Sequence, residues 1–318
     1  MIGAIRYAAG EIAANYDDRR WWKQRITHRL IGGAHSIYPG YGDAVHVMEA
    51  DWDNLLVLDA CRYDLFEEAV DLDRFDEYRR VQSLGSATPE WTRKNFAGRS
   101  FGDTVYVSGN PQTTKHAPDS FHELVAVWRE AFDEEYRTVM PGDVADGVRE
   151  ASAAFPDKRL IGHFMQPHRP FVGSDDLYFG GMYDPDSIVD DDSDVIDGRT
   201  GPRDPWMALE EGETTLDRLW TAYRENLDLV MEEVWSLVND LDGRTVITSD
   251  HGNLIGERGW PVPLKLYGHP TNVRLDGLVT VPWAVIDGER RTVTDEGTTI
   301  DQADMDTVEN RLSDLGYK

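Results

Sequence analysis

Short, nearly continuous apolar runs recur along the chain. Each run is rich in Val, Ile and Leu and does not alternate strictly between apolar and polar positions. Such runs are typical of strands that are buried on both faces of a mostly parallel sheet. The pattern predicts strands at residues 54–60, 104–109, 159–165, 244–250 and 279–286.

Amphipathic segments separate these runs. Their apolar residues recur at the three- and four-residue spacing of a helix that buries one face. The predicted helices lie at residues 61–70, 120–132, 142–155 and 223–241. Because strands and helices alternate, the chain is predicted to form a doubly wound α/β fold, with a mostly parallel sheet covered by helices on both faces.

The domain organisation predicted from this pattern is simple. Residues 1–45 form an N-terminal helical extension, and residues 46–318 form a single α/β domain. An insertion at about 173–215 interrupts the rhythm and is rich in Asp, Gly and Pro, so it is expected to be a long irregular loop, either a lid or disordered. The acidic cluster Asp190–Asp194 lacks the spacing of an EF-hand and is expected to be a solvated part of that loop.

Charge excludes some classes of partner. The 59 acidic and 32 basic side chains give a formal net charge of −27, and only six of the basic residues are Lys. Such a surface repels phosphate backbones and anionic lipid head groups, so we expect no nucleic-acid binding. A Lys-poor acidic composition also suits solubility in concentrated salt, which leads to the hypothesis of a halophilic source.

Features of the sequence predict a cytoplasmic location. Cys61 is the only cysteine, which excludes an intramolecular disulfide and a thiolate metal cluster. The chain contains no run of eighteen apolar residues and no secretion signal, so no integral membrane segment is expected. The first thirty residues contain Trp21, Trp22 and several basic residues; they form either a helix packed on its own domain, which we favour, or a peripheral membrane contact.

Candidate chemistry gathers where the predicted strands end. Asp59 ends the first run, His163 lies in the third run and His168 follows it, and Asp250 and His251 follow the fourth. Because ligands bind beyond the carboxyl ends of parallel strands, these side chains are expected to share one rim. A single acid there is often only a helix cap, but two carboxylates with an imidazole suit a divalent cation.

A second feature is the sequence Ser86-Ala-Thr-Pro. Pro89 suits the first position of a helix, which predicts Thr88 as its N-cap. Helix N-termini bind anions such as phosphate or sulfate, and a hydroxyl there becomes a nucleophile when a metal lowers its pKa. The alternative is that Ser86 and Thr88 serve only to cap the helix.

These stretches together resemble the alkaline phosphatase superfamily, in its sulfatase-like branch. The resembling stretches occur in the family's order and span roughly residues 50 to 288. They are "NLLVLDACRYDLF", "HFMQPHRPFVG", the long segment that ends in "VITSDHGNLIGERG", and "LVTVPWAVI".

The resemblance implies roles for individual residues. Asp59, Asp250 and His251 are the implied ligands of one or two divalent ions (Zn, Mn, Ca or Mg), and His168 is implied to contact the ester anion or the leaving group. His269 is a further ligand, a substrate contact or a structural histidine. Arg62 and His163 are also predicted to contact the substrate, Arg62 through its guanidinium group.

Two departures from the family pattern narrow the expected chemistry. Sulfatases use a cysteine in a C-x-P-x-R setting, which the stretch "SATPEWT" lacks, and Ala60 replaces the usual second aspartate. Both departures favour a hydroxyl nucleophile, with Thr88 preferred and Ser86 as its rival. The predicted function is therefore hydrolysis of phosphate (or sulfate) esters of small molecules, glycans or lipids. The alternatives are phosphoryl transfer to a glycan or lipid hydroxyl, and a catalytically silent metal-binding homologue.

Overall fold

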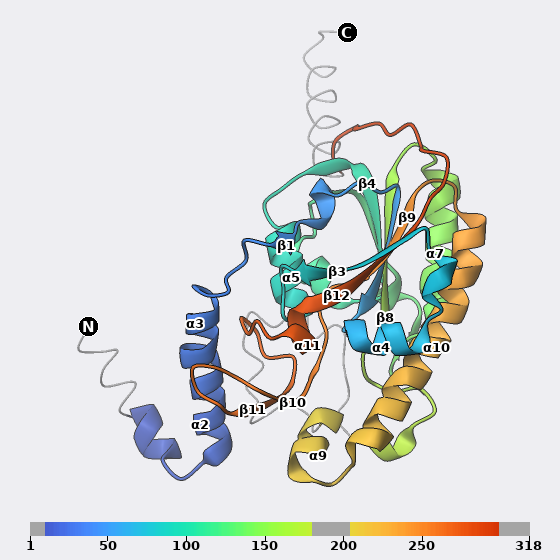
Figure 1. Ribbon diagram of the computed structural model, residues 1–318. Coiled ribbons are helices and arrows are strands. Elements are labelled where there is room, and N and C mark those ends of the chain that lie inside the picture. The colour runs from blue at the N-terminus through green and yellow to red at the C-terminus, as the bar shows by residue number, and fades with distance from the viewer. Residues whose placement is uncertain (1–9, 180–203, 299–318) are drawn as a thin grey trace, which may run out of the picture.

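The central sheet has eight strands. The computed structural model describes residues 10–179 and 204–298. The strand order is β1-β3-β12-β9-β2-β8-β4-β5, and all neighbours are parallel except β12, which runs antiparallel to β3 and to β9 (Figure 1). The strands are β1 (Ala44–Val45), β2 (Asn54–Asp59), β3 (Glu77–Ser83), β4 (Phe101–Ser108), β5 (Phe121–Ala126), β8 (Arg159–Pro167), β9 (Thr245–Ser249) and β12 (Thr280–Ile286).

The strands expected from the apolar runs are confirmed as β2, β4, β8, β9 and β12. Strand β3 was not predicted, because its sequence is largely polar and only Ser83 within it is buried. It is a strand because it pairs with β12 along its whole length. Its structure is determined by pairing with a strand that is distant in sequence. A local sequence pattern contains no information about that partner.

The helix predicted at residues 120–132 is wrong. This stretch forms the edge strand β5 and then a short 3₁₀ helix, η4 (Val127–Arg129). The spacing of its apolar residues is compatible with a helix, but β5 supplies the partner that the N–H and C=O groups on one side of β4 require. Sheet pairing therefore overrides the local periodicity.

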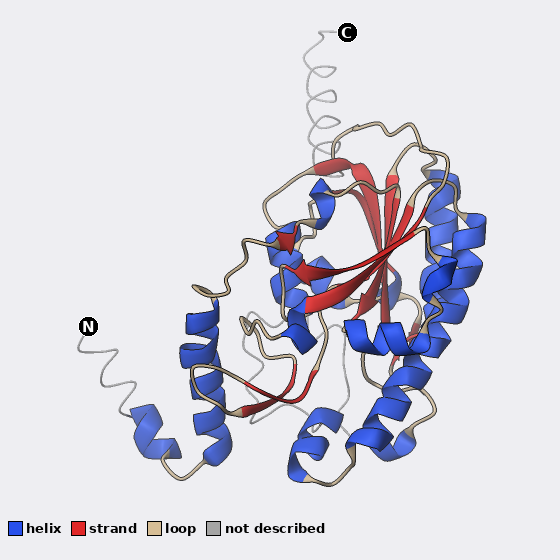
Figure 2. Cartoon of the chain, in the orientation of Figure 1, coloured by secondary structure: helices blue, strands red, loops and turns tan. Residues whose placement is uncertain are grey.

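Helices cover both faces of the sheet (Figure 2), so the predicted fold class is confirmed. One face packs against a large apolar cluster that contains residues of the predicted helices at 61–70, 142–155 and 223–241. The other face packs against Trp91, Phe96 and the segment around Trp52. The helices of the first face are α4 (Tyr63–Ala69), α7 (Pro141–Ala154) and α10 (Leu216–Asp240), and those of the second are α5 (Thr88–Asn95) and α6 (Pro111–His116).

The N-terminal helices pack against their own chain. They are α2 (Arg19–Ile26), a π-helical turn at Thr27–Ile31 and α3 (Gly32–His35). Ile31 is fully buried in a small cluster with residues of the hairpin formed by β10 (Leu254–Arg258) and β11 (Lys265–Gly268) (Figure 1). Peripheral contact with a membrane stays a prediction.

Part of the predicted irregular insertion is helical. Helix α9 (Pro205–Glu211) begins after the cap Asp204, whose side chain accepts the Met207 N–H, and ends at Gly212 in the left-handed conformation. The Asp190–Asp194 cluster lies outside the described residues.

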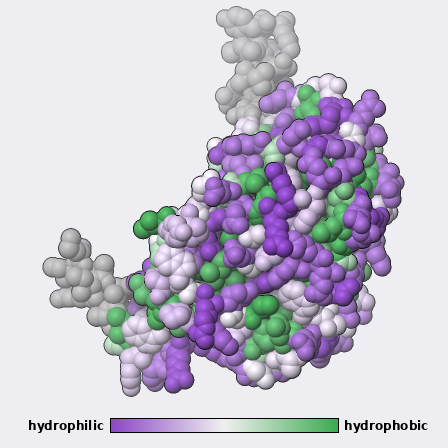
Figure 3. All heavy atoms as spheres, viewed as in Figure 1, coloured by the Kyte–Doolittle hydropathy of each residue, from purple (hydrophilic) through white to green (hydrophobic). Residues whose placement is uncertain are grey.

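The surface agrees with the acidic composition. Hydrophilic residues cover most of the face seen in Figure 3, and hydrophobic residues appear there as small, separate patches. Within residues 10–179 and 204–298, no helix has the length and apolar character needed to cross a bilayer.

Candidate metal centre

The carboxyl ends of four adjacent strands lie at one rim of the sheet. They are β9, β2, β8 and β4, in this order across the sheet. Asp250 follows β9, Asp59 ends β2, His163 lies in β8, and Asn110 follows β4. The residues come together because parallel strands end on the same side of the sheet, as the sequence predicted.

The two carboxylates each have one oxygen held and one oxygen without a partner. Asp250 Oδ1 accepts the backbone N–H groups of Ala60 (2.9 Å) and His251 (2.8 Å), and Asp59 Oδ2 accepts from Asn110 Nδ2 (2.5 Å). The other oxygens, Asp250 Oδ2 and Asp59 Oδ1, are buried without a hydrogen-bond partner. Buried polar atoms of this kind require an explanation, and a bound cation provides one.

His251 completes this arrangement. Its Nδ1–H donates to the carbonyl oxygen of Gly252 (2.7 Å), so the neutral ring presents the lone pair of Nε2. That atom lies 3.4 Å from Asp250 Oδ2, 3.8 Å from Asp59 Oδ1 and 3.3 Å from Thr88 Oγ1. In a tetrahedral site with metal–ligand bonds of about 2.1 Å, neighbouring ligand atoms are about 3.4 Å apart. These residues therefore fit one small divalent ion.

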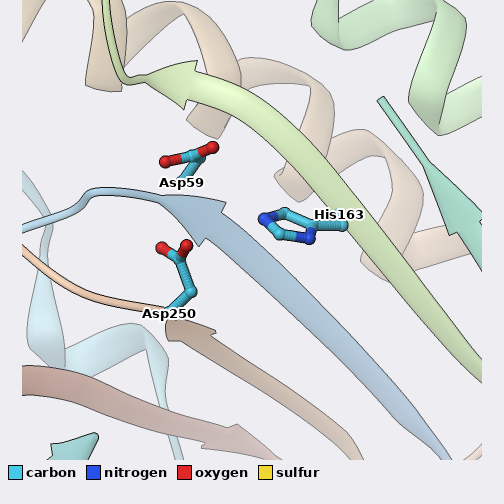
Figure 4. Close-up of side chains that lie close together, drawn as sticks. All are labelled: Asp59, His163 and Asp250. Atoms are coloured by element: carbon cyan, nitrogen blue, oxygen red, sulfur yellow. The ribbon is translucent and has the colours of Figure 1, made fainter. Parts of the chain in front are cut away.

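His163 approaches the same carboxylates from β8 (Figure 4). One ligand atom from each of Asp59, His163 and Asp250 lies within 4.8 Å of the others. His163 Nδ1 is hydrogen-bonded to the Tyr106 hydroxyl (2.8 Å), whereas its Nε2 has no partner. The sequence analysis predicted a substrate contact for this residue, but its geometry equally suits a metal ligand.

The electrostatics of the rim favour a cation. The salt bridges recorded for Asp59 and Asp250 within the described part of the chain involve only His251. Burial and the neighbouring charge of Asp250 raise the pKa of Asp59 well above its usual value, while burial lowers the pKa of His163 to about 4. A divalent ion would compensate the two carboxylates and leave the imidazoles neutral.

The two candidate hydroxyls differ in their surroundings. Thr88 is the first residue of α5, with Ala87 as N-cap, so the predicted assignment of Thr88 as N-cap is wrong by one residue. Thr88 Oγ1 is in contact with His251 Nε2. Ser86 Oγ instead donates to Glu90 Oε2 (2.7 Å), which holds the serine hydroxyl on a structural carboxylate.

His168 and His269 form a pair next to this group. Their Nε2 atoms are 3.3 Å apart, and the ring of His269 lies 4.9 Å, centroid to centroid, from that of His251. His168 Nδ1–H donates to the carbonyl oxygen of Arg169 (2.6 Å), so its Nε2 accepts the proton of His269 Nε2. Burial lowers the pKa of His168 well below its usual value and that of His269 to about 3, which keeps both rings neutral.

Arg62 lies in a different environment from the one predicted. Its guanidinium donates to Asp64 (2.6 and 2.8 Å) and to Glu257 Oε1 (2.7 Å), and it also bonds the carbonyl of Asn253. These contacts join the start of α4 to β10. Its role as a substrate contact stays a prediction.

Sequence reasoning did not identify Asn110 and Tyr106. Asn110 fixes the orientation of Asp59, and Tyr106 fixes that of His163. The position of Asn110 directly after a predicted strand was a usable signal for it. No comparable signal marked Tyr106, because an apolar run with one tyrosine is ordinary for a buried strand.

Comparison with known proteins gives matches in structure only. No protein-family model matches the sequence, and no curated protein matches it in sequence. One similar structure is the C-terminal periplasmic domain of EcEptC from Escherichia coli in complex with Zn, with 13% identity, coverage of 74% of this chain and 72% of that chain, and a TM-score of 0.46.

Two further solved structures are similar in the same way. A protein in the alkaline phosphatase superfamily from Vibrio parahaemolyticus has 10% identity, covers 75% of this chain and 60% of its own, and has a TM-score of 0.38. A putative sulfatase from Bacteroides thetaiotaomicron has 15% identity, and the match covers 74% of this chain and 64% of that chain, with a TM-score of 0.41.

Proposed function

We propose that this protein is a metal-dependent hydrolase of phosphate esters, with Thr88 as the nucleophile. The observation that carries the proposal is the position of Thr88 Oγ1. This atom lies at the N-terminus of α5 and 3.3 Å from His251 Nε2, which in turn faces the unpartnered oxygens of Asp59 and Asp250.

The metal would be held by Asp59, Asp250 and His251, with His163 as a further candidate ligand. A set of carboxylate oxygens and imidazole nitrogens suits Zn²⁺ or Mn²⁺. When bound, such an ion supplies charge neutralisation and lowers the pKa of a neighbouring hydroxyl.

The residues of the chain orient the reaction. The Thr88 hydroxyl gives its proton to water, and Oγ1 attacks phosphorus while the bond between phosphorus and the ester oxygen breaks on the opposite side. N–H groups in the first turn of α5 have no intrahelical partner and are suited to bind the non-bridging oxygens. The His168 and His269 pair lies where it stabilises charge on the substrate, and the departing oxygen takes a proton from water.

Water then cleaves the phosphothreonine formed in the first step and releases inorganic phosphate. In the transferase alternative, a glycan or lipid hydroxyl takes the place of water. Hydrolysis and transfer use the same described residues of the rim. The two reactions differ only in the molecule that accepts the phosphoryl group. Analysis of the products formed with and without added sugar or lipid alcohols separates hydrolysis from transfer.

The test of the proposal is to trap the covalent intermediate. Protein loaded with Zn²⁺ or Mn²⁺ is mixed with an aryl phosphate, quenched in acid and digested, and the peptides are mapped by mass spectrometry. We expect one phosphoryl group on Thr88, no modification after chelation, and none in Thr88→Ala. Metal-dependent turnover with phosphate on Ser86 would reject Thr88, and tight metal binding without turnover of any ester would favour the silent homologue.

A further inference from the structure

A cavity of about 260 Å³ is lined by the segment that directly follows His168. One wall is the loop that joins β6 (Phe132–Asp133) to β7 (Thr138–Val139), and the opposite wall is the segment that follows β8. Its lining includes Tyr136, Arg137, Arg169, Ser174 and Tyr178.

Arg169 connects the cavity to the candidate metal centre. It lines the cavity and directly follows His168 in the chain, and its charge contributes to the low pKa of both His168 and His269. Its Nε is buried and has no hydrogen-bond partner. Within the described residues, no salt bridge is recorded for this side chain, in contrast to Arg62, which contacts two carboxylates.

Arg137 presents a second positive charge to the same cavity. Its guanidinium carbon lies 5.0 Å from the centre of the Tyr178 ring, and among the described residues it too has no recorded salt bridge. Its φ angle of 54° is in the left-handed region, where glycine or asparagine is usual in a tight hairpin loop. An arginine there is therefore not explained by the backbone conformation.

Ser174 provides an independent sign of a ligand. It is 3% exposed and lines the cavity, and its hydroxyl is buried without a hydrogen-bond partner. The carboxylates in the lining, Glu135 and Asp175, belong to exposed residues. Two guanidinium groups and an unpartnered hydroxyl thus line the cavity, together with two carboxylates that belong to exposed residues.

We propose that Arg137, Arg169 and Ser174 form a subsite for a second anionic group on the substrate, a phosphate, sulfate or carboxylate. This inference rests on the proposed function. It defines the substrate class as phosphate esters whose alcohol part carries a further negative charge. His251 contacts His269, His269 contacts His168, and His168 precedes Arg169, so neighbouring residues link the metal centre to the subsite.

The first test measures anion binding without turnover. Calorimetric titration of the metal-loaded protein with inorganic phosphate should show two sites, and Asp250→Asn should retain only the subsite. The double variant Arg137→Gly, Arg169→Gln should bind at the metal centre alone. Glycine at 137 accepts the left-handed conformation, which protects the fold. Arg149→Gln is the matched control, because Arg149 is a surface arginine paired with Asp146 and Asp240.

The outcomes distinguish the subsite from the proposed function. Phosphate binding that Asp250→Asn abolishes completely, with the double variant equal to the control, overturns the subsite and leaves the metal centre intact. A single site that persists in Asp250→Asn and disappears in the double variant supports the subsite while contradicting the metal centre. Binding that is equal in every variant indicates an adventitious ion only and overturns the subsite.

The second test uses two esters. The double variant should raise KM for 2-carboxyphenyl phosphate at least tenfold more than KM for phenyl phosphate, because only the first ester carries the additional charge. Equal changes in KM for both esters would overturn the assignment of the second anionic group.

Discussion

Asp53 and Asp59 are both buried, at opposite ends of strand β2, but their surroundings differ. Asp53, just before the strand, accepts the backbone N–H of Arg244 (2.8 Å) and Nε of Arg290 (2.7 Å) through Oδ2. Asp59, at the carboxyl end, accepts from the neutral amide of Asn110 and faces a second carboxylate, Asp250. The chain itself supplies a cation to the first aspartate but not to the second.

The difference separates a structural carboxylate from a functional one. A buried charge is stable only when it is paired or bound to a metal. Asp53 obtains its counter-charge from the folded chain. Asp59 and Asp250 lie where ligands bind in parallel sheets, and in the proposed function their counter-charge is a bound cation.

The largest expected effect concerns the nucleophile beside these carboxylates. Thr88→Ala should lower kcat for an aryl phosphate by on the order of 10⁴-fold or more, as expected when a nucleophile is removed. Ser86→Ala should stay within about tenfold of the wild type, because the Ser86 hydroxyl bonds Glu90. Steady-state kinetics in the presence of Mn²⁺ or Zn²⁺ measure both variants. The opposite ranking would show that the wrong hydroxyl has been assigned.

The next effect concerns the metal. Asp59→Asn and Asp250→Asn should each weaken binding of Zn²⁺ by about a hundredfold or more, since each removes a charged ligand. Asp53→Asn, the matched change at the other end of the strand, should keep the affinity of the folded protein. Competition with a chromogenic chelator gives the affinities. If Asp53→Asn weakened binding as strongly as Asp59→Asn, the two ends of β2 would not differ as described.

Asp53→Asn and Asp59→Asn should change the stability of the metal-free protein in opposite directions. Asp53→Asn should lower the free energy of unfolding by about 1 kcal/mol, because it removes one of the two carboxylate partners of the half-exposed Arg290. Asp59→Asn should raise it by about 1 kcal/mol at neutral pH. The raised pKa of Asp59 means that ionising its carboxyl costs stability as the pH rises above the unfolded-state value. Urea denaturation in the presence of a chelator measures both changes, and the same sign for both would contradict the comparison.

A further effect on stability concerns Glu90, a buried carboxylate that is paired with its own cation, Lys94. Burial acts to raise its pKa, but Lys94 and Ser86 outweigh burial and lower the pKa to about 2. Its contribution to stability should be complete above the unfolded-state pKa and should be lost as the pH falls towards 2. Glu90→Gln should cost about 2 kcal/mol at pH 7 and less in acid, as measured by thermal unfolding across this range. A cost that did not change with pH would exclude the ion pair as its cause.

The residues of the rim were predictable to different degrees. Asp59, Asp250 and His251 could be identified because each lies at the end of a continuous apolar run, and the end of a run is a local property of the sequence. The sequence favoured Thr88 over Ser86 only because Thr88 adjoins Pro89. The surroundings of the two hydroxyls differ in the folded chain, where Thr88 contacts His251 and Ser86 bonds Glu90.

The sequence by itself determined the alternation of strands and helices and the strand ends that carry the chemistry, because these depend on the order of apolar and polar residues. Tertiary structure alone decided that β5 is a strand, that Asn110 holds Asp59 and that Arg169 borders the cavity. Each of these facts depends on which distant segments become neighbours. That is set by the completion of sheet pairing and of the core, which no local stretch of sequence contains.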